Sequence, residues 1–199
     1  MRLKMLVLPA LFVLAGFVTA QNETVYGEVV TNDANSGYFL RHTGWALEFS
    51  PRHFRDDWIG VPLKLMVANH GTSTAPMLKV DKAGPTTQIL HLGKAMIGQE
   101  ATGSVAGRPG SYVNVCFDEP DVLSWTPLTG RGVWMLGGGL CGFAEGFVTD
   151  DGFFHFSYDV PLLDMLVGRI YVAQAMIFDM DRVSFSNLDS VVVQPDQIF

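Results

Sequence analysis

Hydrophobic and polar positions alternate over short stretches along most of this chain. Between residues 24 and 82, stretches of five to eight residues rich in β-branched and aromatic side chains are separated by breaks rich in Gly, Asn and Thr. This pattern is typical of short strands joined by turns. The strands predicted here are Thr24–Thr31, Tyr38–His42, Trp45–Phe49, Val61–Ala68 and Pro76–Val80.

One short helix is predicted between the third and fourth of these strands. Ser50 suits an N-cap and Pro51 the first helical position, and Gly60 provides a stop. Three strands, a short helix and two more strands within about sixty residues follow the order of a small five-stranded OB-type barrel.

This part of the chain resembles the OB-like modules of exported bacterial proteins. The motifs that carry the resemblance are Tyr26–Val29, Gly37–Leu40, Trp58–Val61 and Ala75–Val80. The resemblance covers about a third of the chain and implies an OB-like barrel over residues 21–83.

The second part of the chain is predicted to form a β-sandwich over residues 88–199. Residues 84–87 are small or turn-forming, which indicates a linker, and short strand-like stretches recur beyond it between Gly and Pro residues. The predicted strands are Ala95–Ile97, Tyr112–Phe117, Val133–Leu136, Phe153–Tyr158, Arg169–Phe178 and Ser190–Val193. The stretch Leu162–Gln174 also suits a helix by composition, but Gly168 and the residues after it favour mostly strand.

Residues 151–187 resemble a C-terminal β-sandwich segment of secreted bacterial proteins that have no assigned function. The elements that carry this resemblance are Asp151–Phe154, Val160–Pro161, Val167–Ala175 and Phe185–Asn187. The resemblance implies a fold and export from the cytoplasm, and it implies no catalytic residue.

The first twenty residues have the pattern of an export signal. Arg2 and Lys4 precede a run of 14 residues without charged or polar side chains, Met5–Val18, and the sequence then reaches Ala20. We therefore predict cleavage after Ala20. A retained membrane anchor is the alternative, but the run is shorter than the roughly 20 residues that span a bilayer. The mature protein is expected to be secreted or periplasmic and free of the membrane.

Charge narrows the range of partners. Removal of Arg2 and Lys4 from the 13 basic residues leaves 11 against 20 acidic residues, a formal net charge of −9. Binding to nucleic acid or anionic lipid depends on Lys and Arg that neutralise phosphates, so neither is expected as a partner. A glycan or a protein of the cell envelope remains.

The two cysteines, Cys116 and Cys141, are predicted to form a disulfide, because an exported protein folds in an oxidising compartment. The bond would close a loop of about 25 residues and contribute about 3 kcal/mol to stability. Two buried free thiols are the alternative.

Candidate catalytic and metal-binding groups form no recognisable motif. The five histidines lack the spacing of a helical zinc site, there is no G-x-S-x-G sequence, and no Lys-Ser/Thr pair follows Gly137–Gly139. We therefore predict no catalytic residue and no cofactor. Weak calcium candidates do exist, although none has the spacing of a calcium-binding loop. They are Asp118, Asp121, Asp179 and Asp181.

Aromatic residues suggest one kind of ligand. Exposed rings can stack on sugars, and Trp125 and Trp134 are the candidates, although filling of the cores is the alternative role for such rings. The first functional hypothesis is an exported, non-catalytic binding or structural module of the cell surface or periplasm. The alternatives are a carbohydrate-binding protein that uses loop aromatics, and a hydrolase with an unrecognised pair of carboxylates.

Overall fold

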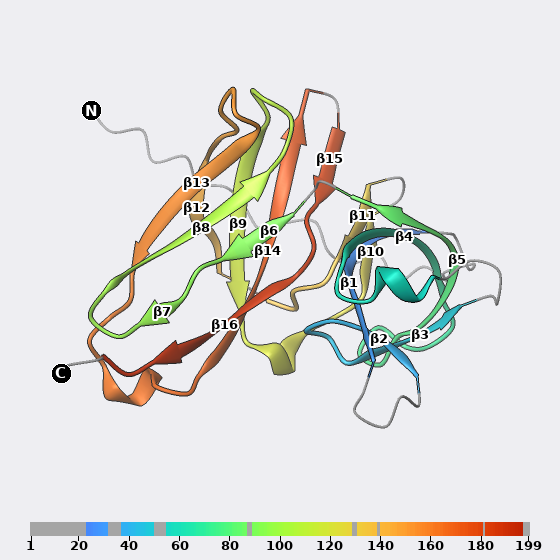
Figure 1. The fold of residues 1–199 in the computed structure, drawn as a ribbon, viewed down its shortest axis with the longest axis horizontal. Helices are drawn as coiled ribbons and strands as arrows, with labels where there is room; N and C mark the ends of the chain where they lie inside the picture. The colour runs from blue at the N-terminus through green and yellow to red at the C-terminus, as the bar shows by residue number, and fades with distance from the viewer. Residues whose placement is uncertain are drawn as a thin grey trace.

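The computed structural model describes residues 23–31, 37–49, 55–86, 89–128, 131–138, 140–180 and 182–196. Within this part of the chain the protein is all-β, with a closed five-stranded barrel followed by two further sheets and a two-stranded hairpin (Figure 1). The predicted class, an all-β chain with a small barrel first and an antiparallel sandwich after it, is confirmed. The predicted signal peptide, residues 1–20, lies outside the described residues.

The barrel closes in the order β1-β2-β3-β5-β4. Its strands are β1 (Glu23–Thr31), β2 (Tyr38–Leu40), β3 (Trp45–Phe49), β4 (Pro62–Asn69) and β5 (Met77–Pro85). Neighbouring strands are antiparallel except β3 and β5, which are parallel. Leu63, Leu65 and Val67 of β4 are fully buried, whereas Lys64 between them is exposed, as the period of two in a strand requires.

Of the residues predicted as a helix before β4, the structure describes 55–60, and Arg55 among them is extended. Ser50 and Pro51 lie outside the described residues, and a 3-10 helix, η1 (Asp56–Trp58), ends just before Gly60. Gly60 has a φ of 75°, a left-handed conformation that glycine adopts without strain. At the other end of the barrel, β5 continues to Pro85, so the first residues predicted as linker belong to this strand.

The sandwich consists of a six-stranded and a three-stranded sheet. The larger sheet has the order β12-β9-β14-β16-β7, with β15 also paired to β14, and the smaller has the order β13-β8-β6. The strands and 3-10 helices are β6 (Leu90–Leu92), β7 (Ala95–Met96), β8 (Glu100–Ala106), β9 (Tyr112–Asp118), η2 (Pro120–Val122), β12 (Leu140–Phe147), β13 (Phe153–Asp159), η3 (Asp164–Leu166), β14 (Ile170–Asp179), β15 (Arg182–Phe185) and β16 (Asp189–Gln194). A separate hairpin is formed by β10 (Thr126–Leu128) and β11 (Gly132–Trp134).

All six strands predicted after residue 88 are present with ends within two residues, as β7, β9, β11, β13, β14 and β16. The sequence did not predict β6, β8, β10, β12 and β15. The stretch Leu162–Gln174 divides, since η3 and a turn occupy its first half and β14 begins only at Ile170.

Two hydrophobic cores are formed by the described residues. One lies between the two sheets of the sandwich, and the other extends from the barrel through the β10–β11 hairpin to Cys116 and Val172 on the outer face of the larger sheet. Figure 1 shows this hairpin between the barrel and the sandwich. At the junction, the rings of Trp45 and Trp125 meet edge to face at 5.8 Å. No helix in the described part of the chain has the length and hydrophobicity to span a bilayer.

The predicted pairing of the two cysteines is present. Cys116 of β9 and Cys141 of β12 form a disulfide between adjacent strands, with their Cα atoms 4.1 Å apart. The bond joins the edge strand β12 to its neighbour β9.

Candidate ligand-binding pocket

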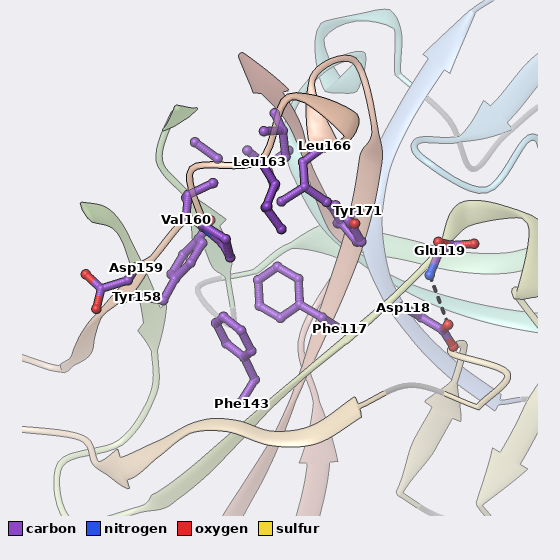
Figure 2. A pocket seen from close by; sticks show the side chains of 14 residues that line it. Phe117, Asp118, Glu119, Phe143, Tyr158, Asp159, Val160, Leu163, Leu166 and Tyr171 are labelled. Carbon is purple, nitrogen blue, oxygen red and sulfur yellow. Dashed lines mark hydrogen bonds between the residues drawn. The ribbon is translucent and has the colours of Figure 1, made fainter. Parts of the chain in front are cut away.

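A pocket of about 470 Å³ opens at one end of the sandwich. Strands of the larger sheet, the end of β13 and the loop that carries η3 line it, as Figure 2 shows. Its surface is mostly apolar. The side chains that form its walls are Ala95, Phe117, Phe143, Tyr158, Val160, Pro161, Leu163, Leu166, Tyr171, Val191 and Val193.

Three aromatic rings in mutual contact form the floor of the pocket. The ring centroids of Phe117 and Phe143 are 4.4 Å apart, and that of Tyr158 lies 5.8 Å from Phe117 and 5.0 Å from Phe143. The rings are inclined to one another rather than stacked, a favourable arrangement for aromatic pairs. Because the rings come from β9, β12 and β13, the floor joins the two sheets.

A β-bulge turns Phe143 toward this floor. The pairing of β12 with β9 shifts register between Leu140 and Ala144, and Gly142 within the bulge has a φ of 75°. The amide of Gly142 donates a hydrogen bond to Oδ1 of Asn114 at 2.9 Å. Bulges often re-aim a side chain in this way. Cys141 precedes Gly142, so the disulfide fixes one end of the bulge.

The loop between β13 and β14 forms the other wall. Leu163, which precedes η3, and Leu166, its last residue, lie opposite Phe117 and Phe143 in Figure 2. Leu162, Leu163 and Met165 remain exposed. Apolar side chains therefore continue from the pocket onto the surface around its mouth.

Charged groups are confined to the rim of the pocket. Asp159 lies on one side and Asp118 and Glu119 on the other (Figure 2). Asp118 accepts hydrogen bonds from the amides of Glu119 and Gly138, both at 2.9 Å. Among the described residues that line the pocket there is no Lys, Arg or His.

Tyr158 is the one floor residue with a polar group. Its hydroxyl is buried and has no hydrogen-bond partner among the described residues. Burial, and to a smaller extent the nearby Asp189 carboxylate, raise the pKa of this hydroxyl above its ordinary value. The group is therefore protonated at neutral pH and can still donate a hydrogen bond.

The two tryptophans predicted as sugar-binding candidates do not line this pocket. Trp125 is only 7% exposed, because its ring packs on Trp45 in the core between barrel and sandwich. Trp134 is half-buried against Phe185, with ring centroids 5.6 Å apart. Trp125 therefore lacks the exposed ring face that stacking on a sugar requires.

The carboxylates predicted as calcium candidates do not come together at one site. Asp118 is bound to backbone amides, Asp179 faces Arg108 at 3.4 Å, Asp121 lies in η2, and Asp181 is outside the described residues. In the described part of the chain, no three His, Cys, Asp or Glu side chains are grouped so that they could hold a metal ion.

A second aromatic feature, not predicted from the sequence, lies on the outer face of the larger sheet. Phe147, Tyr112 and Phe178 face one another across β12, β9 and β14, with centroids 5.4 and 5.9 Å apart. The Tyr112 hydroxyl donates to Glu145 at 2.6 Å. We call these three rings the aromatic row. Strands β9 and β14 were predicted from the sequence, but β12 and the register that aligns the three rings were not.

Comparison with known proteins adds little to this description. The chain matches no family model and no curated protein. Among solved structures, one match is a β-glucuronidase from Parabacteroides merdae, with 13% identity and a TM-score of 0.28. The aligned region covers 56% of this chain and 14% of that one. A likeness this small transfers neither fold nor activity.

Proposed function

We propose that this chain is an exported, non-catalytic binding module of the cell surface or periplasm, and that its ligand binds in the pocket at the end of the sandwich. The observation that carries the proposal is the pocket itself. Its volume of about 470 Å³ lies in the range of sites for small molecules, roughly 300 to 1,000 Å³. Apolar walls with charges only at the rim suit binding of an apolar group.

The barrel serves as a scaffold in this proposal. Its strand order, with β3 and β5 parallel, supports an OB-type module, whose ligands usually meet the second and third strands and the loops after the first and fourth. Here the loop after β4 packs on the sandwich, since the amide of Trp125 donates to the carbonyl of Ser73 at 2.7 Å. One of the usual binding loops is therefore occupied.

A fluorescent apolar probe tests the proposal. N-phenylnaphthylamine, which brightens in apolar surroundings, is titrated into residues 21–199. Phe143→Ala should weaken binding about tenfold, because it removes an aromatic contact from the floor. Phe153→Ala is the matched control, since Phe153 is similarly exposed (41% against 36% for Phe143) but does not line the pocket. Absence of binding to the unaltered protein, or equal losses in both variants, would contradict the proposal.

Carbohydrate binding is a second candidate, supported by the aromatic row. Aromatic faces stack on sugar rings, and Tyr112, Glu145 and Asn114 place polar groups beside Phe147 and Phe178. If a glycan is the ligand, the double variant Phe147→Ala, Phe178→Ala should lose retention on an insoluble polysaccharide. The Phe153→Ala control should keep it. Retention only on envelope protein, unaffected by the double variant, would count against this candidate.

A further inference from the structure

The charged residues that line the pocket are all acidic. Asp118, Glu119 and Asp159 stand at its rim, on two opposite sides, and no basic side chain lines it among the described residues (Figure 2). Glu119 and Asp159 are exposed, and in Figure 2 their side chains point away from the aromatic floor, so their carboxylates lie in solvent beside the pocket. The chain as a whole is also acidic, with 20 acidic against 13 basic residues. A ligand at this mouth therefore enters a negative potential.

The aromatic floor favours the same charge. The faces of Phe and Tyr rings carry negative partial charge, so a cation near them is attracted and an anion is repelled. Three rings, those of Phe117, Phe143 and Tyr158, are gathered within 6 Å of one another at the base of the pocket. The floor thus disfavours an anion that enters the pocket, and the rim favours a cation at its mouth.

The pocket offers different surroundings to the two ends of an amphiphilic ligand. An aromatic or aliphatic body would occupy the space between the floor and the wall of Leu163 and Leu166, where hydrocarbon meets hydrocarbon. In the floor, the Tyr158 hydroxyl is the one polar group, and a single hydroxyl cannot replace the hydration of a charged end group. A charged end would therefore stay at the mouth, in water, beside the rim carboxylates. The sign of that end group then decides between otherwise similar ligands.

We propose that the pocket selects amphiphiles whose polar end is cationic, that is, aryl- or alkylammonium compounds, over neutral and anionic compounds with the same body. This inference rests on the proposed function, because it specifies the ligand of the same pocket. It goes beyond that function by excluding carboxylate-ended amphiphiles such as fatty acid anions.

Three compounds with one body test this selectivity. Phenylbutylamine, phenylbutanol and phenylbutyrate share a phenylbutyl group and end in a cation, a neutral hydroxyl and an anion at neutral pH. Each is used to displace N-phenylnaphthylamine from residues 21–199 at low salt. The amine should bind about tenfold more tightly than the acid, with the alcohol between them. The difference should shrink as salt is added, because the end groups are exposed to solvent.

Charge variants locate the origin of the selectivity. In Glu119→Gln, Asp159→Asn the preference for the amine over the acid should fall to about threefold, while binding of the alcohol stays the same. The control Glu48→Gln, Asp56→Asn makes the same change in net charge on exposed barrel residues and should keep the full preference. A fall of equal size in the control would contradict a local effect of the rim.

The outcomes separate the two claims. If the three compounds bind equally well, the cation preference is wrong and the apolar pocket stands. If none displaces the probe, and the probe itself does not respond to Phe143→Ala, both the preference and the proposed function are wrong. Tighter binding of the acid than of the amine would also overturn the inference.

Discussion

At the scale of single residues, Gln174 is the polar group on which the centre of the larger sheet depends. Its side chain is fully buried. Nε2 donates to the carbonyls of Val133 and Ser186 at 3.1 and 3.2 Å, and Oε1 accepts from the amide of Met135 at 2.8 Å. Gln174 therefore connects β14 to the hairpin strand β11. Nothing in the sequence pairs these positions, because Val133 lies 41 residues away.

Replacing Gln174 should destabilise the folded protein. Gln174→Leu leaves the amide of Met135 and the carbonyls of Val133 and Ser186 buried without this partner, and we expect the free energy of unfolding to fall by about 3 kcal/mol. Gln99→Leu is the control, since the side-chain amide of Gln99 donates to Asp196 on the surface, and it should change stability by less than about 0.5 kcal/mol. Urea unfolding measures both. Equal stability of the two variants would show that the buried bonds of Gln174 are dispensable.

Small residues explain part of what the sequence did not predict. Gly103 in β8 faces the ring of Phe156, and a Cβ at this position would collide with that ring. Gly146 in β12 lies in the same way under Phe154. Glycine lowers the strand propensity of a segment, so β8 and β12 do not stand out from their own residues. The need for glycine at these two positions becomes visible only when β13 is in place, because its Phe154 and Phe156 rings lie over them.

At the scale of elements, strands rich in β-branched and aromatic residues were predictable from the sequence. Strands that are held in place by contacts with distant segments were not. β6 has only three residues, and its backbone is held by side chains of another segment. Asn187 both donates to and accepts from the backbone of Leu90, and Asp189 accepts from the amide of Leu92. Such partners are about a hundred residues away along the chain. The pocket escaped prediction for the same reason, because its floor combines residues 117, 143 and 158.

The disulfide and the bulge form one structural unit with the pocket. Replacing both cysteines, in Cys116→Ser, Cys141→Ser, should lower the free energy of unfolding by about 3 kcal/mol, because the open loop gains entropy in the unfolded chain. Phe143 lies within the bulge, so binding of N-phenylnaphthylamine should weaken as well. The measurements are urea unfolding and probe titration at a temperature where the variant is folded. Unaltered probe affinity would mean that the bulge holds Phe143 without the disulfide.

At the scale of the whole molecule, the barrel and the sandwich meet around His42. Nδ1 of His42 lies 2.8 Å from the Ser190 hydroxyl, and Nε2 lies 3.5 Å from Asp189. Burial is the main cause that lowers the pKa of this imidazole, and Asp189 opposes the shift only in part. His42 therefore remains neutral in the folded protein at pH values where the unfolded chain would bind a proton.

This difference predicts a dependence of stability on pH. Since the unfolded state binds more protons, the stability contributed by His42 is present above its unfolded pKa of about 6.5 and decreases as pH falls through that value. His42→Asn should lose less unfolding free energy than the unaltered protein between about pH 7.5 and about pH 5.5. The other histidines are common to both proteins and cancel in the comparison. Parallel curves for the two proteins would contradict the assignment to His42.

The binding pocket is the central claim, and mapping a ligand onto backbone amides by NMR tests it most directly. Residues 21–199 are titrated with phenylbutylamine, and chemical-shift changes are followed along the chain. The proposal predicts that they concentrate at the end of β9, around the bulge in β12 and in the loop that carries η3, with the barrel unaffected. Changes confined to the barrel or to the aromatic row, or no saturable change anywhere, would contradict it.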